Sequence, residues 1–214
     1  MTDKHALTAE QFDDPEQEHE ASTLGMWVFL GTEVLFFGVL FASYAVLRFN
    51  YPEAFAEASR HTNILLGTVN TAILLTSSLT MALAIRSAQL SKHKLTAGFL
   101  LLTILLGILF LGIKGVEYYG EYEKQLVPGL NFAYEGDNAQ SIKLFFYLYF
   151  IMTGVHAIHV ILGIGTLAVI AVMAWREWFS SDYFTPVELV GLYWHFVDII
   201  WIFLYPFLYL VSRG

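Results

Sequence analysis

The amino-acid sequence predicts an all-α protein, an integral membrane bundle of five transmembrane helices. Of its 214 residues, 57% are hydrophobic and only 14% are charged, whereas a soluble domain has roughly 25% charged residues. The mean hydropathy is +0.58. Five long apolar runs follow one another along the chain, and each is long enough for the roughly 20 residues that a bilayer crossing requires. The short connections between them leave no room for a soluble catalytic domain.

The five helices are expected within one transmembrane domain, residues 23–214, and are placed by where charged and turn residues interrupt the apolar runs. Their predicted bounds are about 24–48, 64–86, 95–117, 142–175 and 188–212. The fourth is longer than one crossing requires, so it is expected to tilt or to project from the bilayer. Residues 1–22 are predicted to form an acidic, flexible tail because they contain few apolar groups.

Charge and cysteine content exclude several functions. The net charge is −8, but seven acidic residues lie among the first twenty, so the rest of the chain is nearly balanced. This distribution gives no support to nucleic-acid binding. The chain has no cysteine, which excludes disulfides, thiolate metal sites and cysteine nucleophiles.

The last apolar run carries His195 and Asp198, two ionisable residues that are rare inside a membrane. At about 100° per residue, Asp198 shares one stripe of the helix with Trp194, Trp201 and Tyr205, and His195 lies at its edge. An Asp that faces acyl chains costs about 2.5–3.5 kcal/mol. We therefore expect Asp198 to have a partner on another helix, in a neighbouring subunit or in a trapped water molecule.

The first helix has two different faces. One face is a stripe of small residues that allows close approach of another helix, namely Gly31, Gly38, Ala42 and Ala45. The opposite face carries larger residues and one acid, namely Met26, Glu33, Phe37, Leu40 and Tyr44. Glu33 is thus predicted to be a buried carboxylate.

The second and third helices carry polar residues that are expected to have structural roles. A polar arc on the second helix is typical of hydrogen bonding between helices; it contains Asn63, Gly67, Asn70, Thr71, Ser77 and Ser78. Lys114 and Glu117 end the apolar run of the third helix, where charged and aromatic groups are expected at the membrane interface.

The ionisable residues inside the apolar runs admit three interpretations; they are Glu33, His156, His159, His195 and Asp198. His156 and His159, at i and i+3, point toward one centre and with His195 would suit a metal or haem, but nothing separates them from hydrogen-bonded core histidines. Glu33, His195 and Asp198 would suit a proton or ion path, although no broken helix accompanies them. We favour the third interpretation, in which these groups form a buried polar network that binds neighbouring helices, subunits and lipids. It predicts no catalytic residue and no metal site.

Five motifs, in order, resemble those of subunit III of haem-copper respiratory oxidases. They are Gly25–Gly38 with Glu33, Asn70-Thr71 with Ser77-Ser78, Gly115–Tyr118 with Glu117, Thr153–Val160 with His156, His159 and the following Gly163, and Tyr193–Trp201 with His195 and Asp198. Together they cover almost the whole chain after the tail.

The resemblance implies a subunit without a redox centre, with no cofactor of its own and with haems and copper in its partners. Those partners would be oxidase subunit I, with subunits II and IV, and phospholipids. The complex reduces dioxygen to water and pumps protons, and this subunit would stabilise subunit I and support oxygen delivery and proton uptake. By the same resemblance, Glu33 would lie near a lipid-filled cleft and Arg176 would meet a phospholipid head group.

The resemblance also implies a location in the bacterial inner membrane, with the N-terminus cytoplasmic and the C-terminus periplasmic. Longer members of this family have seven helices, and this chain begins at what would be their third, so it is similar to the five-helix form. The second wall of the lipid cleft would then come from another chain. Two alternatives remain open from sequence: an accessory membrane subunit of a nitric oxide reductase, and an independent proton- or ion-translocating protein.

Overall fold

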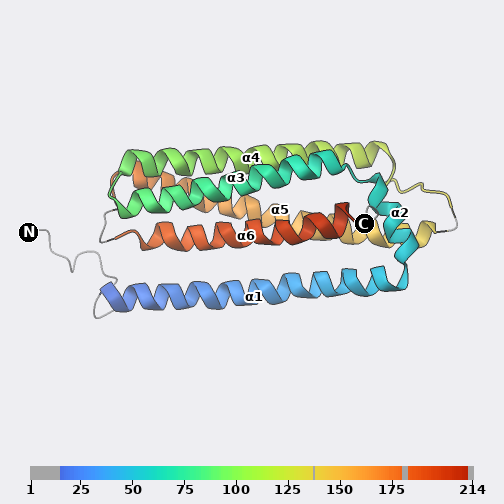
Figure 1. The fold of residues 1–214 in the computed structure, drawn as a ribbon, viewed down its shortest axis with the longest axis horizontal. Coiled ribbons are helices and arrows are strands. Elements are labelled where there is room, and N and C mark those ends of the chain that lie inside the picture. Colours follow the sequence, from blue (N-terminus) through green and yellow to red (C-terminus); the bar gives the residue numbers. More distant parts are fainter. Residues whose placement is uncertain (1–14, 137, 180–182, 212–214) are drawn as a thin grey trace, which may run out of the picture.

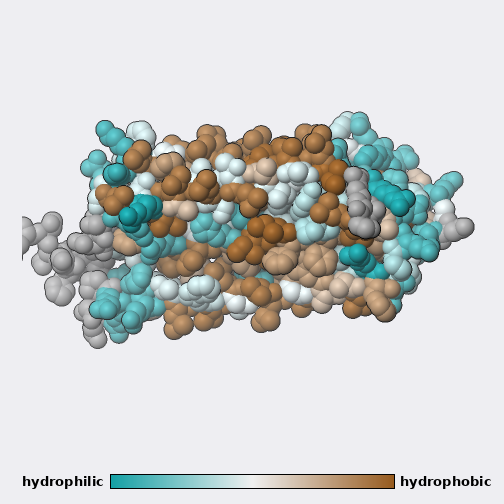
Figure 2. Space-filling model, viewed as in Figure 1, coloured by the Kyte–Doolittle hydropathy of each residue, from teal (hydrophilic) through white to brown (hydrophobic). Residues whose placement is uncertain are grey.

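The computed structural model describes residues 15–136, 138–179 and 183–211, and over these residues it contains six α-helices and no β-strand. Five of the helices are long and apolar enough to cross a membrane, which confirms the predicted all-α, five-helix transmembrane fold. On the face seen in Figure 2, mostly apolar residues cover the middle of the molecule and hydrophilic residues gather at both ends. The molecule therefore has the surface of a protein that spans a bilayer.

Four long helices form a closed bundle. They are α3 (Ile64–Gln89), α4 (His93–Glu123), α5 (Ala139–Trp175) and α6 (Thr185–Tyr209). Helix α3 packs against α4 and α6, and α5 packs against the same two helices. The bundle interior is filled by large side chains, among them Phe110, Tyr149, Trp194, Trp201 and Tyr209. Figure 1 shows these helices running side by side along the long axis.

Helix α1 (Pro15–Asn50) lies outside this bundle and contacts α5, α6 and the short α2, but neither α3 nor α4. It begins at Pro15, where proline and the acidic Glu16 and Glu18 suit a helix start. Residues 15–22, placed in the tail from sequence, are thus helical, while residues 1–14 lie outside the described residues. The face that packs inward carries Leu30, Phe37 and Tyr44, spaced by seven residues.

The small-residue face of α1 points outward. Gly31 and Gly38 are exposed, and a Cβ at either position would meet nothing within 4 Å. Tyr44 on the opposite face is buried, and its hydroxyl donates to the carbonyl of Phe207 on α6. Within this chain, the bulky face of α1 therefore makes the helix contacts and the stripe of small residues makes none.

Helix α2 (Pro52–His61) was not expected from sequence. It has Pro52 in its first turn and Arg60 and His61 in its last, and it buries Ala54, Phe55, Ala58 and Ser59. This short amphipathic helix lies at the end of the bundle (Figure 1), where it packs chiefly against α5. Several helix ends differ from their predicted bounds: α4 continues to Glu123, α5 begins at Ala139, and α6 runs from Thr185 to Tyr209.

Candidate functional site: a buried ion pair and two polar junctions

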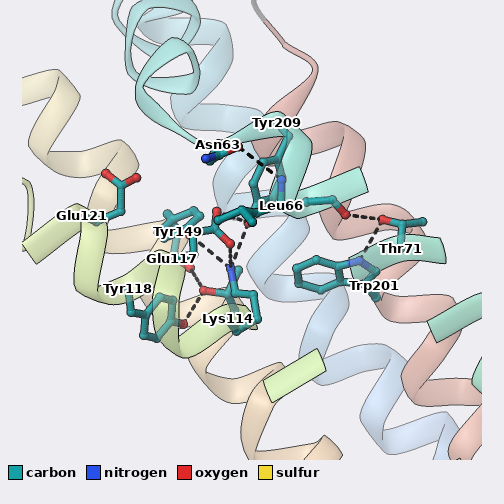
Figure 3. A network of polar contacts seen from close by, with 12 residues as sticks. Asn63, Leu66, Thr71, Lys114, Glu117, Tyr118, Glu121, Tyr149, Trp201 and Tyr209 are labelled. Carbon is teal, nitrogen blue, oxygen red and sulfur yellow. Dashed lines mark hydrogen bonds and ion pairs between the residues drawn. The ribbon is translucent and has the colours of Figure 1, made fainter. Parts of the chain in front are cut away.

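A buried ion pair lies between α4, α5 and α6, about 14 Å along α4 from its end at Glu123. Lys114 Nζ is 2.9 Å from Glu117 Oε2, and each of the two residues is only 3% exposed. Lys114 also donates to the hydroxyls of Tyr149 (3.1 Å) and Tyr209 (2.9 Å). The Tyr209 hydroxyl donates in turn to Glu117 Oε1 at 2.7 Å. Figure 3 shows these side chains converging from three helices.

Aromatic rings surround the ammonium group of this cluster. Lys114 Nζ lies 4.9–5.6 Å from the ring centroids of Tyr118, Tyr149, Trp201 and Tyr209. Rings at this distance attract a cation, and all three N–H groups of Lys114 have acceptors. A buried ion pair survives when hydrogen bonds of this kind offset the cost of removing both charges from water.

Sequence reasoning placed Lys114 and Glu117 at the membrane interface, whereas the structure buries them inside the bundle. A signal for this was present, because both residues continue the spacing of the buried face of α4. That face contains Leu100, Thr103, Gly107, Phe110, Lys114, Glu117 and Glu121. The charge of Lys114 and Glu117 suggested an exposed position, whereas their positions around the helix correctly indicate the buried face of α4.

A second polar junction joins α1 to α5. Glu33 Oε2 lies 3.0 Å from Nε2 of His159, and both side chains are largely buried. The other ring nitrogen of His159 is 2.8 Å from the carbonyl of Val155. Because that carbonyl can only accept, Nδ1 is placed to donate to it, and Nε2 faces the Glu33 carboxyl group. The structure therefore brings together two of the residues singled out from sequence.

His156 and His159 do not share a site. His156 is 1% exposed and packs edge-on against Phe110, with its ring centroid 5.2 Å from that of Trp201. Neither ring nitrogen of His156 has a hydrogen-bond partner among the described residues. Positions i and i+3 differ by about 60° around a helix, which is enough to direct His159 toward α1 and His156 toward α4 and α6.

A third polar junction joins α3 to α6. His195 Nδ1 lies 2.7 Å from the hydroxyl of Ser78, and the indoles of Trp194 and Trp201 donate to Ser77 and Thr71, each at 3.1 Å. The polar arc predicted on the second transmembrane helix, α3, thus hydrogen-bonds to α6. Asp198 is 3% exposed, but neither of its carboxyl oxygens has a partner among the described residues.

Arg176 lies apart from these junctions, immediately after α5, at the opposite end of that helix from Ala139. Its side chain is exposed and is flanked by the exposed Trp175 and Trp178. Over the part of the chain that the structure describes, no three His, Cys, Asp or Glu residues are grouped to hold a metal ion.

These features define a class of protein: a multi-pass helical membrane protein whose helices are joined by hydrogen bonds among buried polar and ionisable side chains. The family model described as "Cytochrome c oxidase subunit III" matches residues 16–213, and the chain belongs to this family, which confirms the resemblance.

Two relatives agree with this assignment. A probable quinol oxidase subunit 3 of Staphylococcus saprophyticus is 30% identical over 204 residues, covering 95% of this chain and 96% of the relative. The protein of the same description in Staphylococcus aureus (strain USA300) is 30% identical over 200 residues and covers 94% of each chain. The chain is thus a subunit of a terminal oxidase complex in a bacterial membrane, and neither a nitric oxide reductase subunit nor an independent transporter is favoured.

Proposed function

We propose that this chain is the subunit without a redox centre in a haem-copper quinol oxidase, and that it stabilises the catalytic subunit I. The observation that carries this proposal is the match to the subunit III family along nearly the whole chain. The two relatives named as quinol oxidase subunits support quinol as the electron donor of the complex. Haems and copper then belong to the partner subunits, and subunits II and IV complete the assembly.

The role of this chain is to hold a stable helical surface beside subunit I, to support oxygen delivery through bound phospholipid and to support proton uptake. Glu33 and His159 support such a role because they hydrogen-bond to each other at the junction of α1 with the bundle. The exposed Arg176, with tryptophans on both sides, has the chemistry to bind a phospholipid phosphate at the membrane interface.

The proposed orientation places the N-terminus in the cytoplasm and the C-terminus in the periplasm. The cationic connection between α3 and α4, with Arg86, Lys92 and Lys94, supports it, since short cytoplasmic loops carry excess Lys and Arg. A cysteine placed in this connection, for example at Ser91, would be labelled by an impermeant maleimide only from the cytoplasmic side of membrane vesicles.

Mild purification through a tag on this chain tests the proposed function, with the visible spectrum and the subunit composition recorded together. We expect haem spectra, a large co-purifying subunit and quinol oxidation by the complex. A chain that purifies alone with a visible absorption spectrum would bind its own cofactor. A chain that purifies alone without such a spectrum would have no stable oxidase partner. Either result contradicts the proposal. Glu33→Gln should reduce turnover or pumping in an assembled complex, and unchanged values would remove Glu33 from the proposed role.

A further inference from the structure

Glu121 is a second buried acid beside the Lys114 cluster. It lies one helical turn beyond Glu117 on α4 and is only 1% exposed. Its Oε1 accepts a hydrogen bond from Lys124 at 3.0 Å, whereas its Oε2 has no partner among the described residues. Figure 3 shows Glu121 next to the cluster, with no direct bond joining the two. A buried carboxylate oxygen without a partner is costly unless water or a proton satisfies it.

Lys124 connects this buried acid to the solution. Its side chain is 48% exposed, and it also donates to the carbonyl of His61 at the end of α2. On the inner side, the cluster ends at Trp201 and Phe110, which are fully buried with ring centroids 4.8 Å apart. The polar groups therefore extend from the exposed Lys124, just after the end of α4, to the buried ion pair, and the aromatic rings of Trp201 and Phe110 lie on its inner side.

We propose that Glu121 and the cluster of Lys114, Glu117, Tyr149 and Tyr209 form a proton-exchange site. Protons reach it from the end of the bundle at which α4 and α6 end. Water occupies the space at Glu121 Oε2 and connects it to the cluster. The carboxylate takes a proton from this water, and a proton from the solution, entering past Lys124, restores the water; release follows the reverse path. The site thus holds a proton without passing it beyond Trp201.

The groups that set the charge of this site come from several elements. On α4 and just after it they are Lys114, Glu117 and Lys124. On α5 and α6 they are Tyr149 and Tyr209, and α2 contributes the backbone carbonyl of His61. The two lysines balance Glu117 and Glu121, so one added proton changes the net charge of a region buried within the bundle. This inference requires only that the chain spans a membrane, and it is independent of the proposed oxidase role.

Infrared difference spectroscopy of the complex purified through this chain tests the site. Spectra taken between acid and alkaline pH, in water and in D₂O, should contain the carbonyl stretch of a protonated carboxyl group that shifts in D₂O. Glu121→Gln should lose this band, and Glu33→Gln, the matched change at a buried acid elsewhere, should retain it. Subtracting the Glu121→Gln spectrum from that of the unchanged protein cancels the bands of Asp198 and the other acids, and a difference that contains no exchanging carbonyl band would overturn the proposal.

Lys124→Gln provides a second variant on an exposed residue, in case Glu121→Gln does not fold. It removes the cation next to Glu121 and should change the pH at which the band appears, and an unchanged midpoint would contradict the site. The infrared band does not depend on oxidase activity. A complex that lacks haem or quinol oxidation would therefore refute the proposed function, and the carbonyl band would still test the proton-exchange site.

Discussion

Glu33 on α1 and His159 on α5 lie 3.0 Å apart, and theirs is the ion pair, among the described residues, that joins α1 to another helix. Because α1 contacts the bundle along one narrow face, this pair holds a helix that has few other polar contacts. His159→Leu should leave the Glu33 carboxyl group without a partner and weaken the attachment of α1 by about 1–3 kcal/mol. Hydrogen exchange should then rise along α1 while that of α3 and α4 stays unchanged.

Glu33→Gln is the control for this prediction, because glutamine keeps the shape and can still hydrogen-bond to His159. Hydrogen exchange of α1 in this variant should stay close to that of the unchanged protein. Equal protection of α1 in His159→Leu would show that apolar contacts alone hold the helix in place.

Helical periodicity predicted two different faces of α1, but it did not predict that the face with Glu33, Phe37 and Tyr44, and not the stripe of small residues, makes the contacts within this chain. Two further features escaped prediction for physical reasons. Helix α2 is short and polar, so no hydropathy window finds it, although Pro52 and the cations of its last turn were signals. Lys114 and Glu117 are charged, so they were placed at the interface, and only three surrounding helices explain why burial is tolerated.

Lys114→Met should destabilise the protein severely. It removes the cation that binds Glu117 and leaves a carboxylate buried without its partner, a loss of roughly 3–5 kcal/mol. The double variant Lys114→Met/Glu117→Leu removes both charges and should recover most of this stability. Thermal unfolding of the purified chain, with the yield of assembled complex, measures the effect.

Lys124→Met is the matched control for Lys114→Met, since Lys124 also pairs with a glutamate three residues away but is 48% exposed. Its effect on unfolding should be smaller than that of Lys114→Met, because the Lys124 side chain is half exposed and an exposed cation gains less from an ion pair. If the two single variants unfolded at the same temperature, the buried pair would have no special structural importance.

Two glycines on α5 should respond differently to the same substitution. A Cβ at Gly163 would lie 2.9 Å from two ring atoms of Trp194, whereas a Cβ at Gly165 would meet nothing within 4 Å. The Trp194 ring is fully buried and its indole donates to Ser77, so it has little freedom to shift. Gly163→Ala should therefore lower the free energy of unfolding by about 1–3 kcal/mol.

Gly165→Ala should leave that free energy unchanged or raise it, because alanine favours a helix over glycine by about 1 kcal/mol. Thermal unfolding of both variants under one condition gives the comparison. A Gly163→Ala protein as stable as the Gly165→Ala protein would mean that α5 and α6 can separate without loss.

The α3 to α6 junction predicts unequal roles for His195 and Asp198. His195→Leu leaves the Ser78 hydroxyl without its partner across the helix interface, which should cost about 1–3 kcal/mol. Asp198 has no partner among the described residues, so Asp198→Asn keeps the shape, breaks no side-chain bond and should leave the unfolding temperature equal or higher. Lower stability in Asp198→Asn than in His195→Leu would show that a bound water or another chain satisfies Asp198.

Outside the membrane, Tyr134 links the α4–α5 loop to α2 by donating to Glu57 Oε1 at 2.5 Å. This hydrogen bond, with some burial and the negative charge of Glu57, raises the pKa of Tyr134 above the ordinary tyrosine value. A raised pKa means that the bond stabilises the folded protein below about pH 10, the ordinary tyrosine pKa, and that this stabilisation is lost as the pH rises through the raised value.

Glu57→Gln should return the pKa of Tyr134 toward its ordinary value, because the carboxylate no longer favours the neutral hydroxyl. Ultraviolet absorbance follows the ionisation of all tyrosines as the pH rises. Subtracting the titration of the same protein with Tyr134→Phe leaves the titration of Tyr134. We expect the Tyr134 titration to move to lower pH in the Glu57→Gln background. An identical titration in both backgrounds would mean that Glu57 does not hold the Tyr134 hydroxyl in solution. The loop would then contact α2 through the Lys124 hydrogen bond to the His61 carbonyl and the packing of Tyr134 against the His61 ring.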